Sequence, residues 1–362
     1  MDSPDFSRRA FLQTATLALG SAAVASAQTA KPKIKVGYDN FAVRAMGWKA
    51  PELLDFAVKL KCDTLFISDL DAFGSLDDAA LRDVKKRADN VGIALYAGGW
   101  SICPTSKSWG RDKRNWKSGE EHLETGIRVA RTVGSPVYRV VLGSADDRKT
   151  EGGIKARIAD TVKVLKNCRQ QALDAGVKVS VENHAGDMHS WELKTLIEDA
   201  GADFVGVNFD SGNAAWTLED PLDAFETLAQ YVNCSSLRDD MIWATDDGAS
   251  VQWTAVGEGL LDWKKFTARW AEVCPNVPIQ IETISGFARN FAYKKDDFWT
   301  NYDRKPEAFA KFEALASKGH KIESFKAPDG VDRKKAEQEF QRGDLERSIK
   351  YLRETLGIGL KA

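Results

Sequence analysis

The 362-residue sequence is poor in several residue types, and each scarcity limits what the chain can do. It has four histidines, and its five cysteines lack the short paired spacings of a disulfide framework or a zinc knuckle. Its 51 basic and 53 acidic residues nearly balance, so no overall positive field is available to hold nucleic acid. Beyond the N-terminus no apolar run reaches the roughly 18 residues that span a bilayer. We therefore expect no nucleic-acid partner and no membrane span in the mature chain.

Residues 1–27 have the three parts of an export signal in the right order. Arg8 and Arg9 form a paired-arginine start, a mild apolar run covers 17–24, and 25–27 read Ala-Ser-Ala, a small-residue cleavage site. The segment resembles a twin-arginine signal, which implies a periplasmic or secreted protein that is exported already folded. A chance Arg-Arg pair before a short buried helix is the alternative.

From Ile34 onward, short apolar or β-branched runs alternate with longer amphipathic stretches, which is typical of repeated βα units in an α/β protein. Eight such units favour a closed (β/α)8 TIM barrel over an open doubly wound sheet. The predicted strands are Ile34–Tyr38, Thr64–Ser68, Ala94–Ala97, Val137–Leu142, Lys178–Glu182, Phe204–Phe209, Asn233–Leu237 and Ile279–Glu282. Seven amphipathic stretches between them are predicted helices, among them a long one over Gly153–Ala175.

The barrel is expected to occupy residues 31–290, and a helical C-terminal extension that packs on it is expected over 291–362. Two helices are predicted there, Pro306–Lys318 and Arg333–Leu356. The second is rich in charge on a short apolar stripe, which favours a solvated helix on the barrel over a partner-binding tail.

Three of the predicted strands end in a carboxylate, at Glu182, Asp210 and Glu282. The active site of a barrel of this type is built at the C-terminal ends of its strands, so these side chains are expected to converge. Burying three carboxylates together is costly unless a cation neutralises them, which favours a divalent metal. Each one singly has another explanation, because it could cap the next helix or pair with Arg139 or Arg238.

Five short motifs carry a resemblance to a known family: Val-Glu-Asn-His at 181–184, Phe-Asp-Ser-Gly-Asn at 209–213, Ser-Leu-Arg-Asp at 236–239, Gly-Glu-Gly at 257–259 and Ile-Glu-Thr at 281–283. In this order they resemble the xylose-isomerase-like sugar isomerase/epimerase superfamily. The resemblance implies metal ligands after strands five to eight, which fall on Glu182, Asp210, Ser236 and Glu282. It also implies a divalent cation, Mn, Mg, Co or Zn.

One of these positions departs from the family. Ser236 stands where the family has a histidine, and a serine hydroxyl is a weak metal ligand. Metal affinity is then lower, a water fills the gap, or the site is degenerate. Asp239 and His184 are the nearby substitutes. His184 could be a ligand or a substrate contact, and could equally hydrogen-bond a carboxylate that lies behind the metal ligands.

The family chemistry implies that Glu182 and Glu282 move a proton on opposite sides of a free sugar or sugar derivative, by way of an enediolate. Alternatives are a lyase or hydrolase that acts on 3-keto-glycosides with the same site, a non-catalytic sugar-binding barrel, and an apurinic-site nuclease. The nuclease would need more histidines and a basic face.

Contacts to a carbohydrate substrate are expected from the loops that follow several strands. An indole packs well on a sugar ring, and a cationic side chain would hold an anionic group. Most of the eleven tryptophans are nonetheless expected in the core. The expected substrate contacts are Tyr38, Trp100, Lys107, His184, Asn213, Arg238 and Asp239. A homo-oligomer is left open.

Overall fold

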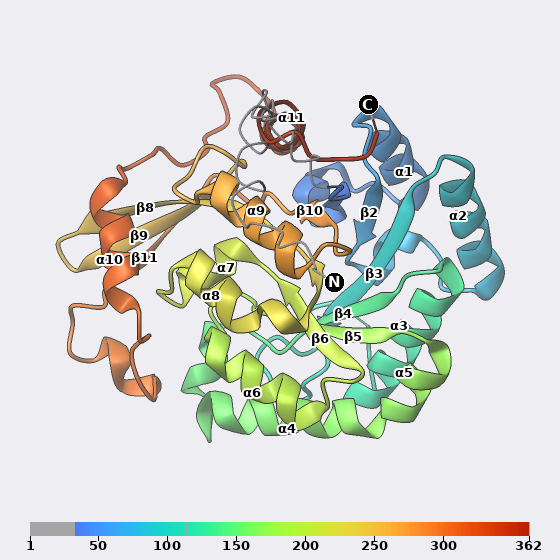
Figure 1. Cartoon of the computed structure of the whole chain (residues 1–362), viewed down its shortest axis with the longest axis horizontal. Helices are drawn as coiled ribbons and strands as arrows, with labels where there is room; N and C mark the ends of the chain where they lie inside the picture. Colours follow the sequence, from blue (N-terminus) through green and yellow to red (C-terminus); the bar gives the residue numbers. More distant parts are fainter. Residues whose placement is uncertain (1–32, 113, 362) are drawn as a thin grey trace, which may run out of the picture. The chain divides into compact units, whose positions relative to one another are not determined.

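The computed structural model describes residues 33–112 and 114–361, and its centre is a sheet of eight parallel strands (Figure 1). The strands follow the chain around the barrel in the order β10-β1-β2-β3-β4-β5-β6-β7. Their bounds are Val36–Asp39 (β1), Thr64–Ile67 (β2), Ala94–Ser101 (β3), Val137–Val141 (β4), Lys178–Glu182 (β5), Val205–Phe209 (β6), Val232–Ser235 (β7) and Ile279–Ile281 (β10). The predicted strands are therefore confirmed to within a few residues, and so is the TIM-barrel fold. The proposed export signal lies outside the described residues.

Closure of the barrel falls between β7 and β10. Leu237 pairs with Ile281 in an isolated parallel bridge, and its backbone N–H donates to the carbonyl of Gln280 at 2.7 Å. The N–H of Glu282 in turn donates to the carbonyl of Leu237 at 2.9 Å. These bonds fix the two segments that follow β7 and β10 side by side, at the end of the barrel where site residues are expected.

Helices pack around the barrel in the βα order that the sequence predicts. Their bounds are Ala50–Lys59 (α1), Asp78–Asn90 (α2), Gly119–Val133 (α3), Gly153–Asn167 (α4), Arg169–Ala175 (α5), Ser190–Ala200 (α6), Pro221–Leu228 (α8) and Trp263–Val273 (α9). The single helix predicted over 153–175 is two helices, α4 and α5, which are separated at Cys168. Val and Ile side chains of the strands and the apolar faces of these helices share one buried core.

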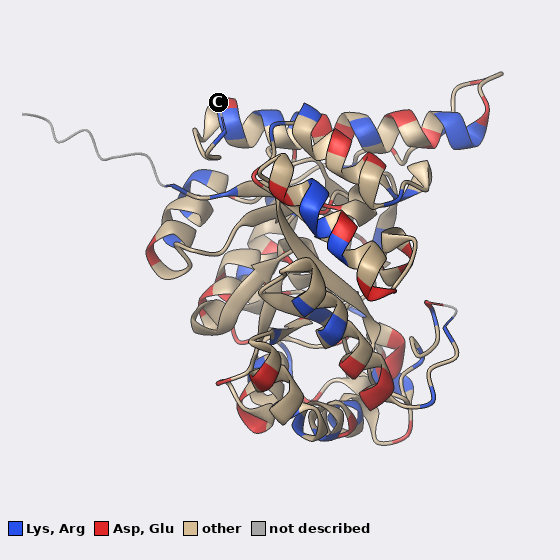
Figure 2. Ribbon diagram, turned by 90° about the vertical axis from the view of Figure 1, so that its right-hand side faces the viewer, with Lys and Arg blue, Asp and Glu red and all other residues tan. Residues whose placement is uncertain are grey.

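The last long helix, α11 (Arg333–Lys350), belongs to the barrel more closely than the expected extension over 291–362 suggests. Its residues Leu345 and Ile349, with Leu352 beyond it, are buried in the same core as the strands. It contacts β1 and β10, although β11 and α10 come between β10 and α11 in the chain. Figure 2 shows basic and acidic segments alternating along its outer face. Helix α11 therefore occupies the place of the eighth barrel helix. Its outer side is charged, as the sequence indicates.

A second, three-stranded antiparallel sheet was not predicted. It consists of β8 (Asp239–Thr245), β9 (Gly248–Thr254) and β11 (Ala288–Phe291), in the order β11-β9-β8. Helix α10 (Phe309–Lys318) packs against it (Figure 1). The hairpin of β8 and β9 follows barrel strand β7 directly, and β11 follows β10. This sheet therefore places its side chains beside the C-terminal ends of the barrel strands.

Within the described residues, no helix is both long enough and apolar enough to cross a lipid bilayer.

A buried ion pair near α6 gives a stability prediction that is separate from the strand ends. Arg148 and Glu192 are 3% and 7% exposed, and their closest atoms, Nη2 and Oε2, lie 2.5 Å apart. His189 also contacts Glu192, with Nδ1 at 3.1 Å. Burial alone raises the pKa of Glu192, but His189 and Arg148 outweigh it and lower that pKa from 4.5 to about 2.

We expect Glu192→Gln to lower the free energy of unfolding by about 3 kcal/mol at pH 7. A lowered acid pKa means that the unfolded chain binds more protons between pH 4.5 and 2, so the pair's contribution is present above pH 4.5 and is lost as pH falls through 2. Urea unfolding at several pH values measures this. A difference between wild type and variant that stays constant from pH 7 to pH 3 would contradict the prediction.

Candidate active site

Four buried carboxylates lie at the C-terminal ends of the barrel strands. Asp39 ends β1, Glu182 ends β5, Asp210 follows β6 and Glu282 follows β10, and none is more than 4% exposed. Glu182, Asp210 and Glu282 each offer an oxygen, and these oxygens lie within 4.8 Å of one another. The three carboxylates that the sequence singles out therefore share one place, as parallel strand ends in a barrel require.

Two buried arginines supply positive charge to these carboxylates. Arg139, from the middle of β4, places Nε 3.1 Å from Glu182 Oε2 and Nη2 3.7 Å from Asp39 Oδ2. Arg238 follows β7, and its Nη2 contacts both Asp210 Oδ2 and Glu282 Oε2. The pairing of these carboxylates with Arg139 and Arg238, which the sequence left as an alternative, is thus present.

Burial and charge shift the pKa values of the whole group. Burial, followed by the charge of Glu282, raises the pKa of Asp39 to about 7, against the opposing effect of Arg139. Burial likewise raises the pKa values of Glu182, Asp210 and Glu282, and the arginines oppose this. Burial thus favours the protonated form of all four carboxyl groups, and raised pKa values of this kind suit acid and base roles.

Side-chain amides orient the carboxylates. Asn208 Nδ2 donates to Glu182 Oε2 at 3.0 Å and to Ser236 Oγ at 3.1 Å. Asn213 Nδ2 donates to Asp210 Oδ2 at 2.6 Å and to Glu182 Oε1 at 3.2 Å. Glu182 therefore has both oxygens held, and only a narrow range of positions is open to it.

Asp210 is the carboxylate that is most firmly tied to the fold. Its Oδ1 accepts from the backbone N–H groups of Gly212 at 2.8 Å and Asn213 at 3.1 Å, at the start of α7 (Ser211–Trp216). These bonds make it the N-cap of that helix. It is less free than Glu182 or Glu282 to move a proton, which leaves the latter two as the acid/base candidates.

A cavity of about 160 Å³ opens beside Glu182 and Glu282. Aromatic side chains and arginines line it, which is the combination that binds the apolar faces and the oxygens of a sugar. Besides the two glutamates, its lining comprises Phe41, Trp100, Arg111, Arg139, His184, Ala185, Asn213, Trp216, Arg238, Trp253 and Ile284.

Four of the predicted substrate contacts, Trp100, His184, Asn213 and Arg238, line this cavity. The ring of His184 lies edge-on to that of Trp100, with centroids 6.3 Å apart, and its Nδ1 is 2.6 Å from the carbonyl of Gly143. Burial lowers the pKa of His184 to about 4, so the ring is neutral at pH 7. His184 therefore lines the cavity as an uncharged ring, and its bond to the Gly143 carbonyl fixes the orientation of that ring.

The three other predicted contacts lie elsewhere. Tyr38 points away from the barrel axis, because its neighbour Asp39 faces inward, and it donates to the carbonyl of Leu53 in α1 at 2.7 Å. Asp239 accepts from four backbone N–H groups and from Trp263 Nε1 at 2.8 Å, so it organises the loop before α9. Lys107 is exposed and outside the cavity lining. The structure thus does not bring these three side chains to the cavity, and their contact with a substrate stays a prediction.

Several cavity residues were not predicted as substrate contacts. Arg139 carried a signal, because a charged residue inside the apolar strand Val137–Val141 needs a buried partner. Trp253 and Trp216 stack with ring centroids 4.0 Å apart, and they belong to β9 and α7. Neither of these two elements was predicted, and the sequence favoured core or surface packing for Trp253.

The donor set decides whether a metal ion fits. The oxygens of Glu182, Asp210 and Glu282 are close enough together to hold one. Arg238, however, already contacts two of the three carboxylates, and Ser236 Oγ is engaged with Asn208 at 3.1 Å and with Asp39 at 3.4 Å. With Arg238 in this position, the residues do not fit a metal ion.

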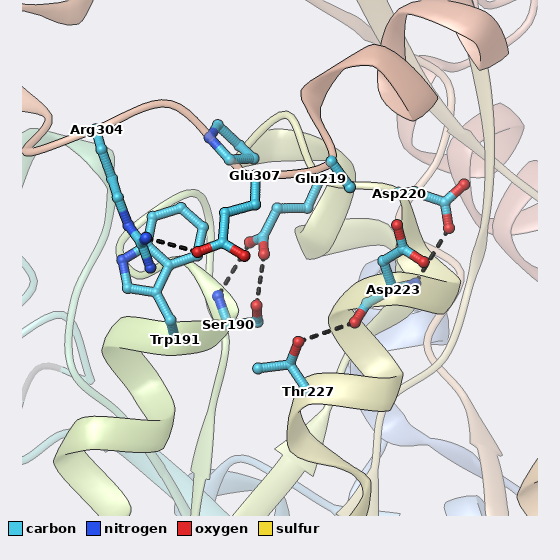
Figure 3. Close-up of a pocket in the computed structure, with 10 residues that line it drawn as sticks. Ser190, Trp191, Glu219, Asp220, Asp223, Thr227, Arg304 and Glu307 are labelled. Carbon is cyan, nitrogen blue, oxygen red and sulfur yellow. Dashed lines mark hydrogen bonds and ion pairs between the residues drawn. The ribbon is translucent and has the colours of Figure 1, made fainter.

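A larger cavity of about 330 Å³ lies away from the strand ends, between α6, α8 and the segment before α10 (Figure 3). It is rich in charge, but the protein itself pairs its charged groups. Glu219 accepts from the N–H of Ser190 at 3.0 Å and from its hydroxyl at 2.5 Å, and Arg304 pairs with Glu307 at 2.7 Å. The smaller cavity holds the acid/base candidates and is the candidate active site.

Known proteins share this architecture. The profile of a family described as "Xylose isomerase-like TIM barrel" matches residues 43–285. A curated protein, the uncharacterized protein YihM of Escherichia coli (strain K12), is 22% identical over 157 residues, which are 42% of this chain and 48% of that protein. The chain thus matches about half the length of this relative.

Solved structures show the same fold at low identity. A D-psicose 3-epimerase crystallised with D-fructose is 14% identical with a TM-score of 0.56, over 90% of this chain and 100% of that one. A xylose isomerase-like TIM barrel protein from Mycobacterium smegmatis in complex with magnesium is 13% identical with a TM-score of 0.53, over 78% and 98%. At these identities the likeness shows the fold alone.

Proposed function

Because the chain belongs to the family of xylose isomerase-like TIM barrels, we propose that it is a carbohydrate isomerase or epimerase that transfers a proton between two carboxyl groups. The observation that carries the proposal is the placement of Glu182 and Glu282 on one aromatic-lined cavity. A protein that only binds sugar has no need for a pair of buried acids whose pKa values are raised. The D-psicose 3-epimerase named above, one of the solved neighbours, supports the same reaction class.

The proposed reaction begins on a sugar that carries a carbonyl beside a hydroxyl-bearing carbon. The Glu282 carboxylate takes the proton from that carbon, and the electron pair of the C–H bond moves onto the carbonyl oxygen as the enediolate forms. The carboxyl group of Glu182, on the other side of the substrate, returns a proton to carbon. Positive charge from Arg139 and Arg238 stabilises the enediolate oxygen.

The proposed proton transfer does not require the divalent metal that the resemblance implies. Glu182, Asp210 and Glu282 would hold it, once Arg238 had left two of them, and it would supply Lewis-acid stabilisation of the substrate oxygens. The proton transfers assigned to the two glutamates do not depend on it.

The environment in which the protein works narrows the substrate. We propose that residues 1–27 direct the folded chain out of the cytoplasm, on the strength of the paired arginines, the apolar run and the Ala-Ser-Ala site. An exported enzyme meets free sugars and glycosides rather than sugar phosphates. The proposed substrates are therefore free sugars and oxidised sugar derivatives.

Incubation with free ketoses, aldoses and 3-keto-glycosides in D2O tests the proposal. We expect deuterium at the carbon beside the carbonyl, together with a new isomer, measured by NMR and mass spectrometry. Deuterium with release of the aglycone would instead show the lyase reaction on 3-keto-glycosides, which starts from the same enediolate. Saturable sugar binding without any exchange would contradict both and leave a sugar-binding barrel.

A further inference from the structure

We infer that the guanidinium of Arg238 takes the place of a metal ion in this site, as the permanent cation among the carboxylates and as a donor to the substrate oxygen. The first part concerns the free protein alone, and the second rests on the proposed function. Three separate observations carry the inference: where Arg238 is held, what Ser236 does, and which N–H groups of Arg238 have no partner.

Arg238 is held on several sides. One nitrogen, Nη2, contacts Asp210 and Glu282, two of the three carboxylates that would have to hold a metal. Its guanidinium carbon lies 4.3 Å from the centre of the Trp253 ring, and the side chain is 1% exposed. Trp253 itself stacks on Trp216. A guanidinium that is paired and stacked in this way would lose both kinds of contact if a metal displaced it.

Ser236 and its surroundings offer no strong fourth ligand. Its hydroxyl is engaged with Asn208 Nδ2 at 3.1 Å and lies 3.4 Å from Asp39 Oδ2. The histidine that lines the same cavity, His184, is not among the residues whose ligand atoms lie within 4.8 Å of one another, which are Glu182, Asp210 and Glu282. Ser236 in place of the family's histidine and Arg238 among the carboxylates thus support the same conclusion. The positive charge in this site comes from the side chain of Arg238 rather than from a metal ion.

Arg238 also has unused donors. Its Nε and Nη1 are buried, and neither finds a hydrogen-bond partner among the described residues, although Arg238 lines the 160 Å³ cavity. Guanidinium N–H bonds lie in the plane of the group, so contact with the face of Trp253 does not consume them. Because these two donors point away from different sides of the guanidinium, a substrate carbonyl oxygen would accept from one of them, and that bond strengthens as negative charge develops on the oxygen. Arg238 thus provides the charge and the oxygen contacts that a metal would provide.

Metal binding in the absence of sugar tests the first part of the inference. The full chain is purified without chelators, its metal content is measured by mass spectrometry, and Mn²⁺ is titrated by calorimetry into wild type and Arg238→Ala. We expect wild type to carry far less than one metal ion per chain. Arg238→Ala should bind Mn²⁺ at least about tenfold more tightly, because a unit positive charge beside the site is gone. Arg238→Ala combined with Asp210→Asn should lose that gain.

One tightly held metal ion per wild-type chain would overturn the inference without any variant. So would an Arg238→Ala protein with a native circular dichroism spectrum and no gain in Mn²⁺ affinity. Arg238→Lys, which keeps a cation but loses the planar donors, should keep the low Mn²⁺ affinity of wild type.

Sugar exchange tests the second part. Exchange by wild type should survive EDTA, and Arg238→Lys should lower it, because the lysine lacks the donors that meet the substrate oxygen. Loss of wild-type exchange in EDTA would refute the inference and leave the proposed proton transfer intact. If no sugar exchanges at all, the proposed function fails, and the metal titration still decides which cation occupies the site.

Discussion

Glu282→Gln is expected to abolish deuterium exchange from solvent into the sugar substrate while the fold survives. Glutamine has the shape of glutamate but cannot take a proton from carbon, and a positioned acid or base contributes about 10²–10⁴-fold to such a step. Arg238 keeps its contact with Asp210 in the variant, so the cation stays in place. Exchange followed by NMR measures the effect, and circular dichroism with a thermal melt checks the fold.

A matched control is Glu258→Gln, which changes an exposed glutamate outside the cavity that pairs with Arg347 at 2.6 Å. Its exchange rate should equal that of wild type. Glu182→Gln should lose formation of the new isomer as fully as Glu282→Gln does, because that product needs both proton transfers. Unchanged exchange in a folded Glu282→Gln protein would refute the role assigned to this residue and with it the proposed mechanism.

The barrel and the three carboxylates could be predicted because both depend on local regularities. Eight apolar runs at βα spacing define the strands, and a polar residue at the end of an apolar run lies at the end of a strand. Convergence of Glu182, Asp210 and Glu282 then follows from barrel geometry alone, without knowledge of any side-chain contact. The position of Tyr38 could also have been predicted, because successive residues of a strand face opposite sides, so Tyr38 and Asp39 cannot both face inward.

The position of the Arg238 guanidinium among the carboxylates could not be predicted from the residues around it in the sequence. Whether Arg238 turns inward depends on Trp253, on the far strand of a hairpin that was not predicted. That hairpin did leave a signal: Asp247 and Gly248 stand between two runs rich in aromatic and β-branched residues, a combination that favours a tight β-turn. Alternation with helices is the pattern that identifies a barrel, so an antiparallel insertion after strand β7 interrupts it and is easily taken for a loop.

Arg139→Met is expected to cause the largest loss of stability among these substitutions. Arg139 is 5% exposed, lies 3.1 Å from Glu182 and 3.7 Å from Asp39, and donates to the carbonyl of Gly99 at 2.7 Å. Methionine fills much of the same volume but leaves two buried carboxylates without their cation, which costs about 3–5 kcal/mol. Urea unfolding at pH 7 measures the difference.

The pH dependence separates charge from packing. Arg139 opposes the burial that raises the pKa values of Asp39 and Glu182, so its removal raises both further. A raised acid pKa means that the folded chain binds more protons than the unfolded one, and stability then falls as pH rises through the interval between the two pKa values. The loss in free energy of unfolding that Arg139→Met causes should therefore shrink as the pH is lowered from 8 to 5. The double variant Arg139→Met/Glu182→Gln should recover part of that loss at pH 8.

Arg269→Met, which removes an exposed pair with Glu226, is the control and should change stability little at any pH. A deficit of Arg139→Met that is equally large at pH 5 and pH 8 would mean that packing, rather than the charge shared by Asp39 and Glu182, is what Arg139 contributes.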